Sequence, residues 1–242
     1  MKIGLLLCDH VLEPLREAAK GDYDCMYEAM VTKAAHQIHL AAPLTIKKYF
    51  VIDEYFPDSP NDCDAWLVTC SHHDANEDNH WISRLKCFVL EIIEYRKPLA
   101  GICFGHQLIS LVLGGKVARR NKWIAGVQKV HLRSNQFSSQ PNIKLLSLHR
   151  DEVTVAPPNA NVIASSSQVP IAMLSIPPNI LTFQHHMEYT KRYLIALINS
   201  RKDLIGSEIT QIALNGMSQD LDSSYAGRLL LKFLAQHRNL NQ

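Results

Sequence analysis

Long apolar runs, an excess of charge of one sign and low-complexity tracts are all missing from this 242-residue chain. No uninterrupted apolar stretch reaches the about 18 residues that cross a bilayer, so we expect neither a membrane-spanning helix nor a membrane partner. With 25 Lys+Arg against 23 Asp+Glu the formal net charge is only +2, too weak for nucleic acid to be the main partner. The composition therefore favours an ordered globular protein whose ligand is small.

Cysteine usage indicates a reducing compartment. The six cysteines form no Cys-x-x-Cys pair and no compact disulfide framework. The first apolar run is short and ends in Asp9 and His10 rather than at a small-residue cleavage site, so we do not expect a secretory signal. We expect a cytoplasmic protein with reduced thiols.

Apolar runs alternate with helical patterns, which is typical of an α/β sheet covered by helices. Strands are expected at residues 3–8, 48–54, 65–69 and 99–102, and helices at 81–95 and 106–113. Short runs between residues 127 and 181 indicate a β-rich half, and the stretch after Tyr189 has helical periodicity. We expect one domain over 1–242, with a core at about 1–192 and a C-terminal helical extension at about 193–242.

The segment Gly101-Ile-Cys-Phe-Gly-His-Gln107 places Cys103 between a buried strand and a helix. Flanking glycines permit the sharp turn of a nucleophile elbow, here with Cys in place of Ser. The positive end of the helix favours the thiolate, and the backbone N–H of Phe104 is placed to meet a developing oxyanion. The alternative interpretation is a buried structural cysteine, because free cysteines are commonly buried.

A thiol nucleophile needs a base and often a group that orients the base. The segment Gln184-His-His-Met-Glu188 follows a short apolar run, and it offers His186 as the base with Glu188 as the orienting carboxylate. Most His-x-Glu pairs are surface residues, so this pair gains weight only together with the cysteine elbow.

These two segments together resemble the class I, or triad, glutamine amidotransferases, and in particular the stand-alone branch similar to the amidotransferase domain of GMP synthetase. The segments Asp64–Ser71, Leu113–Val117, Gly126–Val130 and Leu148–Val153 also match that branch in order. The resemblance covers roughly residues 2–189. It implies a three-layer, flavodoxin-like fold with a twisted, mostly parallel sheet flanked by helices.

The resemblance also implies roles for individual residues. Cys103 would attack the side-chain amide of glutamine, His186 would act as general acid and base, and Glu188 would fix the imidazole tautomer. The backbone near Ser71 and at Phe104 would form the oxyanion hole, while Gln107 and the backbone near His149 would hold the glutamyl group. The chemistry implies no cofactor and no metal.

One departure from the family pattern falls in the oxyanion loop. Relatives carry Thr-Gly-Ser where this chain has Thr69, Cys70 and Ser71, so a side chain replaces a glycine beside the scissile carbonyl. A metal site at His36 and His39, or in the histidine-rich loop after Ser71, matches no standard zinc spacing, and a solvated polar loop is the simpler interpretation.

Three functions follow as hypotheses. The first is a glutaminase that cleaves the γ-carboxamide through a γ-glutamyl thioester on Cys103 and supplies ammonia to an acceptor, with the synthetase half on another polypeptide. The second is a stand-alone γ-glutamyl peptidase that acts on glutathione-like peptides through the same thioester. The third is a catalytically silent regulatory protein that keeps the fold.

Overall fold

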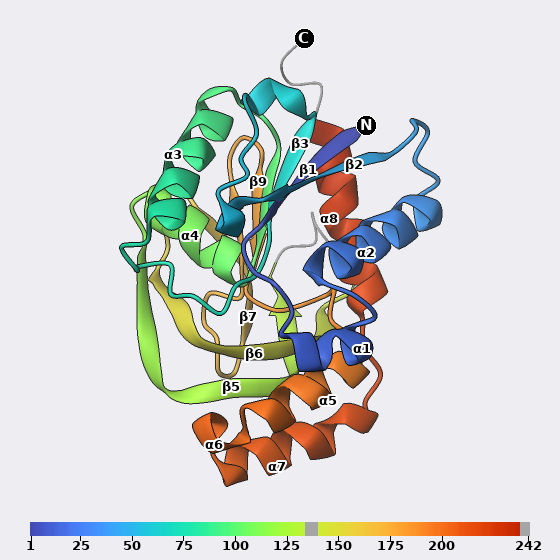
Figure 1. Ribbon diagram of the computed structural model, residues 1–242, viewed down its shortest axis with the longest axis vertical. Helices are drawn as coiled ribbons and strands as arrows, with labels where there is room; N and C mark the ends of the chain where they lie inside the picture. The colour runs from blue at the N-terminus through green and yellow to red at the C-terminus, as the bar shows by residue number, and fades with distance from the viewer. Residues whose placement is uncertain (134–139, 238–242) are drawn as a thin grey trace.

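The alternating pattern of the sequence becomes one nine-stranded sheet in the computed structural model, which describes residues 1–133 and 140–237 (Figure 1). The strands are β1 (Lys2–Leu7), β2 (Thr45–Phe50), β3 (Ala65–Val68), β4 (Leu99–Ile102), β5 (Lys116–Leu132), β6 (Asn142–Val155), β7 (Asn161–Ser166), β8 (Met173–Ile176) and β9 (Ile180–Phe183). The α-helices are α1 (Arg16–Ala19), α2 (Tyr23–Gln37), α3 (His80–Glu94), α4 (Phe104–Val112), α5 (Lys191–Ser200), α6 (Lys202–Ile205), α7 (Ser207–Asn215) and α8 (Ser223–His237).

The sheet has a parallel half and an antiparallel half. Its strand order is β2-β1-β3-β4-β9-β8-β7-β5-β6, and the neighbours from β2 to β9 pair in parallel. From β9 to β6 every pairing is antiparallel, and β5 with β6 forms a long bent hairpin. The predicted α/β fold with a parallel sheet between helices is confirmed, and the antiparallel half is the β-rich region expected after residue 127.

The inner parallel strands β1, β3, β4 and β9 are buried under helices on both faces, whereas the edge strand β2 is partly exposed. Successive side chains of a strand point to opposite faces, so each inner strand contributes to both cores. In β1, Ile3, Leu5 and Leu7 join the core beneath α2, α5 and α8, whereas Leu6 joins the core beneath α3 and α4. All four of these side chains are fully buried. Strands buried on both faces explain why the sequence shows continuous apolar runs rather than alternation.

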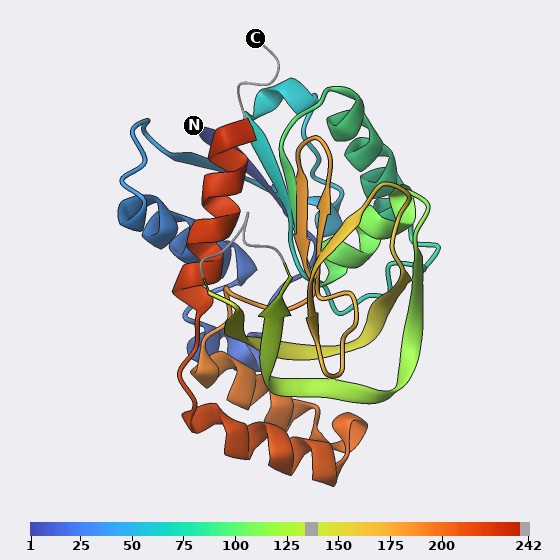
Figure 2. The ribbon, with the colours of Figure 1, turned by 180° about the vertical axis from the view of Figure 1, so that it is seen from behind.

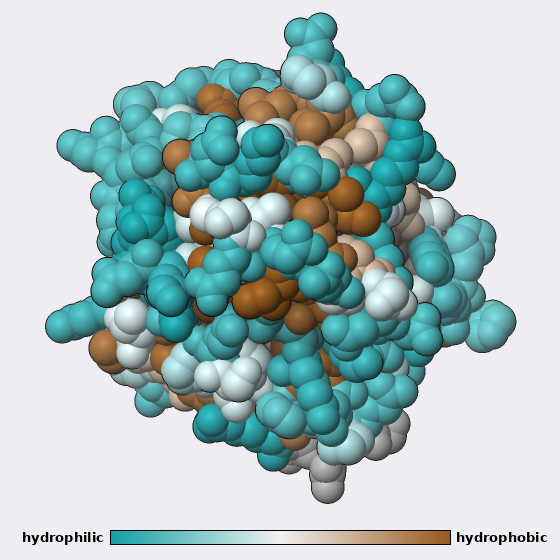
Figure 3. Space-filling model, turned by 90° about the horizontal axis from the view of Figure 1, so that it is seen from below, coloured by the Kyte–Doolittle hydropathy of each residue, from teal (hydrophilic) through white to brown (hydrophobic). Residues whose placement is uncertain are grey.

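The two helical layers are visible from opposite sides of the molecule (Figure 1, Figure 2). Helices α3 and α4 cover one face, and α8 packs along α2 on the other. Helices α5, α6 and α7 gather at one end beside β5, and apolar side chains there are scattered among hydrophilic ones (Figure 3). Leu204 and Ile212 are exposed at this end. Among the described residues, no helix has both the length and the apolar character needed to span a bilayer.

Two strands differ from the expected ranges. The strand expected at 48–54 is β2 at Thr45–Phe50, followed by a 3-10 turn at Val51–Asp53. Val51 is fully buried within that turn, so an apolar run alone could not separate it from the strand. Strand β5 begins at Lys116, before the β-rich half expected from residue 127. The apolar pattern missed its first half, in which most side chains are exposed and many are charged.

Candidate active site

The carboxyl ends of three neighbouring parallel strands meet at one edge of the sheet. Ser71 follows β3, Cys103 follows β4, and the segment Gln184–Glu188 follows β9. Because β3, β4 and β9 are adjacent in the sheet, residues far apart in the sequence converge at this edge. Open α/β sheets characteristically bind ligands outside such carboxyl ends.

Cys103 occupies the sharp turn between β4 and α4. Its φ of 53° and ψ of −102° lie in a region that non-glycine residues rarely adopt. The turn requires glycine on both sides: a Cβ on Gly105 would lie 2.3 Å from the carbonyl oxygen of Val68, and one on Gly101 would lie 2.6 Å from the backbone of Gly105. The thiol therefore stands on a strained backbone at the first turn of a helix, as the elbow pattern predicts.

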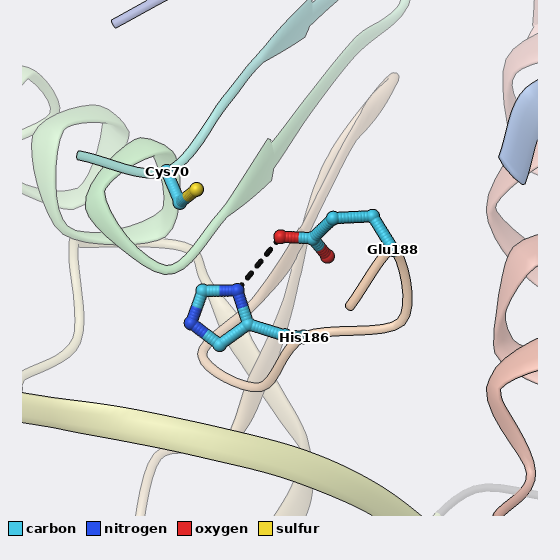
Figure 4. Close-up of side chains that lie close together, drawn as sticks. All are labelled: Cys70, His186 and Glu188. Carbon is cyan, nitrogen blue, oxygen red and sulfur yellow. Dashed lines mark hydrogen bonds and ion pairs between the residues drawn. The ribbon is translucent and has the colours of Figure 1, made fainter. Parts of the chain in front are cut away.

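His186 and Glu188 form a buried pair beside this turn (Figure 4). The Nδ1–Oε1 distance is 2.7 Å, and Nδ1 must donate because an ionised carboxylate only accepts. The backbone N–H of His186 donates to the carbonyl of Leu146 at 2.8 Å, and the imidazole stacks on Tyr189 with ring centroids 3.9 Å apart. These contacts fix the ring on three sides and leave Nε2 buried without a hydrogen-bond partner among the described residues.

The charge state of His186 follows from its neighbours. Burial alone lowers the pKa of the imidazole, but the charge of Glu188 and interactions with the thiols of Cys103 and Cys70 raise the pKa well above its ordinary value. The imidazolium is thus favoured near neutral pH. An imidazolium in this position is a proton donor for a leaving group.

Cys70 lies in the loop expected to meet the oxyanion, and its backbone is not left-handed. It is absent from the described residues with positive φ, so its φ does not require glycine. The backbone N–H of Cys70 donates to the hydroxyl of Tyr27 at 2.9 Å, and Tyr27 in turn donates to Glu188 Oε1 at 3.0 Å. Burial raises the pKa of the Cys70 thiol to about 11, so this sulfur remains protonated near neutral pH.

A cleft of about 230 Å³ opens over Cys103, and it brings together most of the residues expected to hold substrate. Ser71, Gln107 and His149 line it. The side chain of Phe104 does not line it, because the ring packs on Trp81 with centroids 5.7 Å apart. The role expected of Phe104 involves only its backbone N–H, so this placement leaves that expectation open.

The inner wall of the cleft presents polar atoms with fixed roles. His149 Nδ1 donates to the carbonyl of Asp151 at 3.0 Å, and burial lowers the pKa of this imidazole to about 3. Nε2 of the neutral ring is therefore an acceptor, and it is buried without a partner among the described residues. Gln107 Nε2 donates to the same carbonyl at 2.8 Å and to Gln184 Oε1 at 3.2 Å.

Two side chains of this site were not identified from the sequence. Gln184 directs Nε2 toward the Cys103 sulfur at 3.6 Å, and its position directly before the two histidines was the available signal. Tyr27 lies on α2 and reaches Glu188 across a sequence separation of 161 residues, so no local spacing could reveal it.

The described residues contain one group of three close metal-ligating side chains, namely Cys70, His186 and Glu188, whose ligand atoms lie within 4.8 Å of one another (Figure 4). The sequence had suggested different candidates around His36 and in the loop after Ser71. In that loop His73 instead pairs with Glu77 at 2.8 Å, which agrees with the interpretation as a polar loop.

The chain is similar to several known proteins. The family described as glutamine amidotransferase class-I matches residues 71–194, about half of the chain. The chain is 34% identical over 172 residues to gamma-glutamyl peptidase 4 of Arabidopsis thaliana, covering 66% of this chain and 68% of that protein. It is also 34% identical over 158 residues to gamma-glutamyl peptidase 2 of the same plant, covering 62% and 64% of the two chains.

More distant matches extend the comparison. A glutamine-hydrolyzing GMP synthase of Streptococcus pyogenes is 33% identical over 171 residues, covering 59% of this chain and 33% of that one. The solved structure of a glutamine amidotransferase from Thermotoga maritima superposes with a TM-score of 0.73, covering 99% of this chain and 98% of that one. At 16% identity that likeness concerns the fold alone.

Proposed function

Because the chain belongs to the class-I glutamine amidotransferase family, we propose that it is a cysteine hydrolase of γ-glutamyl bonds, with Cys103 as nucleophile. The observation that carries the proposal is the buried His186–Glu188 pair at 2.7 Å, whose free Nε2 lies in the same site as a thiol on a strained elbow. A nucleophile, a base and an orienting carboxylate are the parts that such chemistry requires.

The reaction proceeds through a γ-glutamyl thioester. The thiolate of Cys103 attacks the γ-carbonyl carbon, and the resulting oxyanion is met by the backbone N–H groups of Phe104 and the Ser71 loop. As the C–N bond breaks, the leaving amine takes a proton from the imidazolium of His186. Water then attacks the thioester and gives a proton to the neutral imidazole, the C–S bond breaks, and glutamate leaves. Glu188 accepts from Nδ1 throughout and holds the ring in place.

A γ-glutamyl peptide is the substrate class that we favour. Two relatives of this chain at 34% identity are named gamma-glutamyl peptidases, and their matched regions cover about two thirds of their own length. We place the reaction in the cytoplasm, where the six cysteines, all free in the structure, would stay reduced.

Glutamine is the second candidate, favoured by the match to a glutamine-hydrolyzing GMP synthase over 171 residues. In that case the amine is ammonia, and a separate synthetase subunit would consume it. The thioester and the roles of the three side chains are unchanged, so the two candidates differ only in the leaving group.

An assay of glutamate release distinguishes the peptidase from the glutaminase. We expect kcat/KM for a γ-glutamyl dipeptide such as γ-glutamylalanine to exceed that for glutamine by at least about tenfold, a difference of about 1.4 kcal/mol in transition-state binding. Cys103→Ala, which keeps the cleft but removes the thiol, should abolish release. A preference for glutamine would select the glutaminase, and wild-type protein that releases glutamate from neither compound would contradict the proposed function.

A further inference from the structure

The outer part of the cleft over Cys103 is rich in cationic side chains. Arg119, Arg150 and Arg201 line it, and among the described residues Asp151 is the only carboxylate-bearing one that does so. Arg119 is neutralised there, since its guanidinium makes two bonds to Asp151, at 2.8 and 3.0 Å, and reaches Asp74 at 3.4 Å. The remaining two arginines have no ion pair among the described residues.

The two unpaired guanidinium groups are placed differently. Arg150 comes from β6, and its Nε donates to the carbonyl of Arg120 at 3.0 Å, which orients the guanidinium while leaving its terminal N–H groups available. Arg201 follows the last residue of α5 and lies outside residues 71–194, the part matched by the family. A planar fork of N–H donors matches the two oxygens of a carboxylate and can bind it in bidentate fashion.

These two arginines are more exposed to solvent than the polar residues of the inner wall. Gln107 and His149 are only 3% and 4% exposed, whereas Arg150 and Arg201 are partly exposed at the mouth. A γ-glutamyl compound held by the inner polar groups at Cys103 would extend its leaving group toward the mouth. Ammonia leaves nothing there to bind, but the amino acid released from a γ-glutamyl dipeptide carries a carboxylate.

We propose that Arg150 and Arg201 form a leaving-group subsite that binds the carboxylate of the residue attached to the γ-glutamyl group. The proposal rests on the proposed function and narrows its substrate class to γ-glutamyl peptides with a free carboxylate on the leaving amine. It also gives the helical segment after residue 190 a part in substrate recognition, through Arg201.

The test is a binding titration on the Cys103→Ala variant of the full chain, which cannot form the thioester. The probes are γ-glutamylglycine and its C-terminal amide, which differ only in the distal carboxylate. We expect the carboxylate form to bind at least about tenfold more tightly, as one charge-assisted contact allows. Adding Arg201→Gln or Arg150→Gln to this variant should weaken the binding of γ-glutamylglycine about tenfold and change the binding of its C-terminal amide less than about twofold.

Arg192→Gln is the matched control, because Arg192 lies on α5, which ends just before Arg201, but pairs with Glu17 at the surface. It should leave both affinities unchanged. If Arg201→Gln weakened the binding of both probes equally, the proposal would be overturned, because the arginine would then bind the α-carboxylate that both probes share. Equal affinity for the two probes, or binding of neither, would overturn it as well. Carboxylate preference in the titration without turnover by wild-type protein would contradict the proposed function and leave the subsite standing.

Discussion

Glu188→Gln isolates the electrostatic part of the proposed site. Glutamine keeps the shape of the side chain and an oxygen that can accept from His186 Nδ1, now 2.7 Å from Glu188 Oε1, and from Tyr27 at 3.0 Å. Its amide nitrogen takes the place of Oε2, which has no partner among the described residues. The fold should therefore persist while the negative charge is lost.

The magnitude follows from the buried contact. A hydrogen bond to a charged group contributes about 1.5 to 3 kcal/mol and one between neutral groups about 1 kcal/mol, so losing the charge while keeping the bond costs about 1.3 kcal/mol, and kcat/KM should fall about tenfold. The charge of Glu188 raises the pKa of His186, and its removal should lower that pKa. Activity that needs the imidazolium is lost as pH rises through this pKa, so the alkaline limb of the pH–rate profile should move to lower pH.

Steady-state hydrolysis of a γ-glutamyl substrate from pH 5 to 9 measures both effects, and circular dichroism checks that the variant is folded. A folded variant with kcat/KM within about twofold of wild type, or with an unmoved alkaline limb, would refute the reasoning that Glu188 controls the imidazolium.

Three further predictions test the surroundings of the site. Gly105→Ala forces a Cβ to within 2.3 Å of a backbone oxygen and should cost about 1 to 3 kcal/mol in denaturant unfolding, whereas Gly216→Ala, with φ −72° and its nearest contact at 3.6 Å, should cost nothing; equal costs would contradict the elbow geometry. Burial lowers the pKa of His106 to about 3, so between about pH 6.5 and pH 3 the unfolded chain binds a proton that the folded chain does not, and the free energy of unfolding falls as pH falls. In urea titrations, wild-type protein should therefore lose about 2 kcal/mol more stability between pH 7 and pH 5 than His106→Gln does. The same pH dependence in both proteins would refute this. Cys70→Gly should not raise turnover, because the Cys70 backbone has no positive φ to relieve, and a faster variant would show that the side chain strains the oxyanion loop.

Helices and strands whose apolar pattern is clear within a short stretch could be predicted from the sequence. The strand at 99–102 has the bounds of β4, and the helix expected at 81–95 is α3 at His80–Glu94, because buried apolar residues recur along it and Pro98 follows it. The grouping of Cys103 with His186 and Glu188 rested on the cysteine elbow, the His-x-Glu pair and the family resemblance, whereas the adjacency of β4 and β9 that brings these segments to one sheet edge is known only from the structure.

What escaped prediction depends on long-range contacts. The first half of β5 is exposed and charged, and it becomes a strand only by pairing with β6. Tyr27 touches Glu188 from a helix whose apolar period gives no sign of a functional hydroxyl. Arg201 follows a helix in the tail and acquires its place in the cleft only through the packing of α5. Contacts of this kind depend on tertiary packing, and the spacing of residues in the sequence does not predict them.

The central claim is that Cys103 is the nucleophile of a glutamyl site, and labelling by a glutamine analogue with a diazoketone group tests it most directly. Intact-protein mass followed by peptide mapping should show one adduct, located on Cys103 and absent from Cys103→Ala. The Cys70→Ala variant serves as control and should still be labelled, since the Cys70 thiol has a pKa of about 11 and stays protonated. An adduct on Cys70, or none on wild-type protein, would contradict the account.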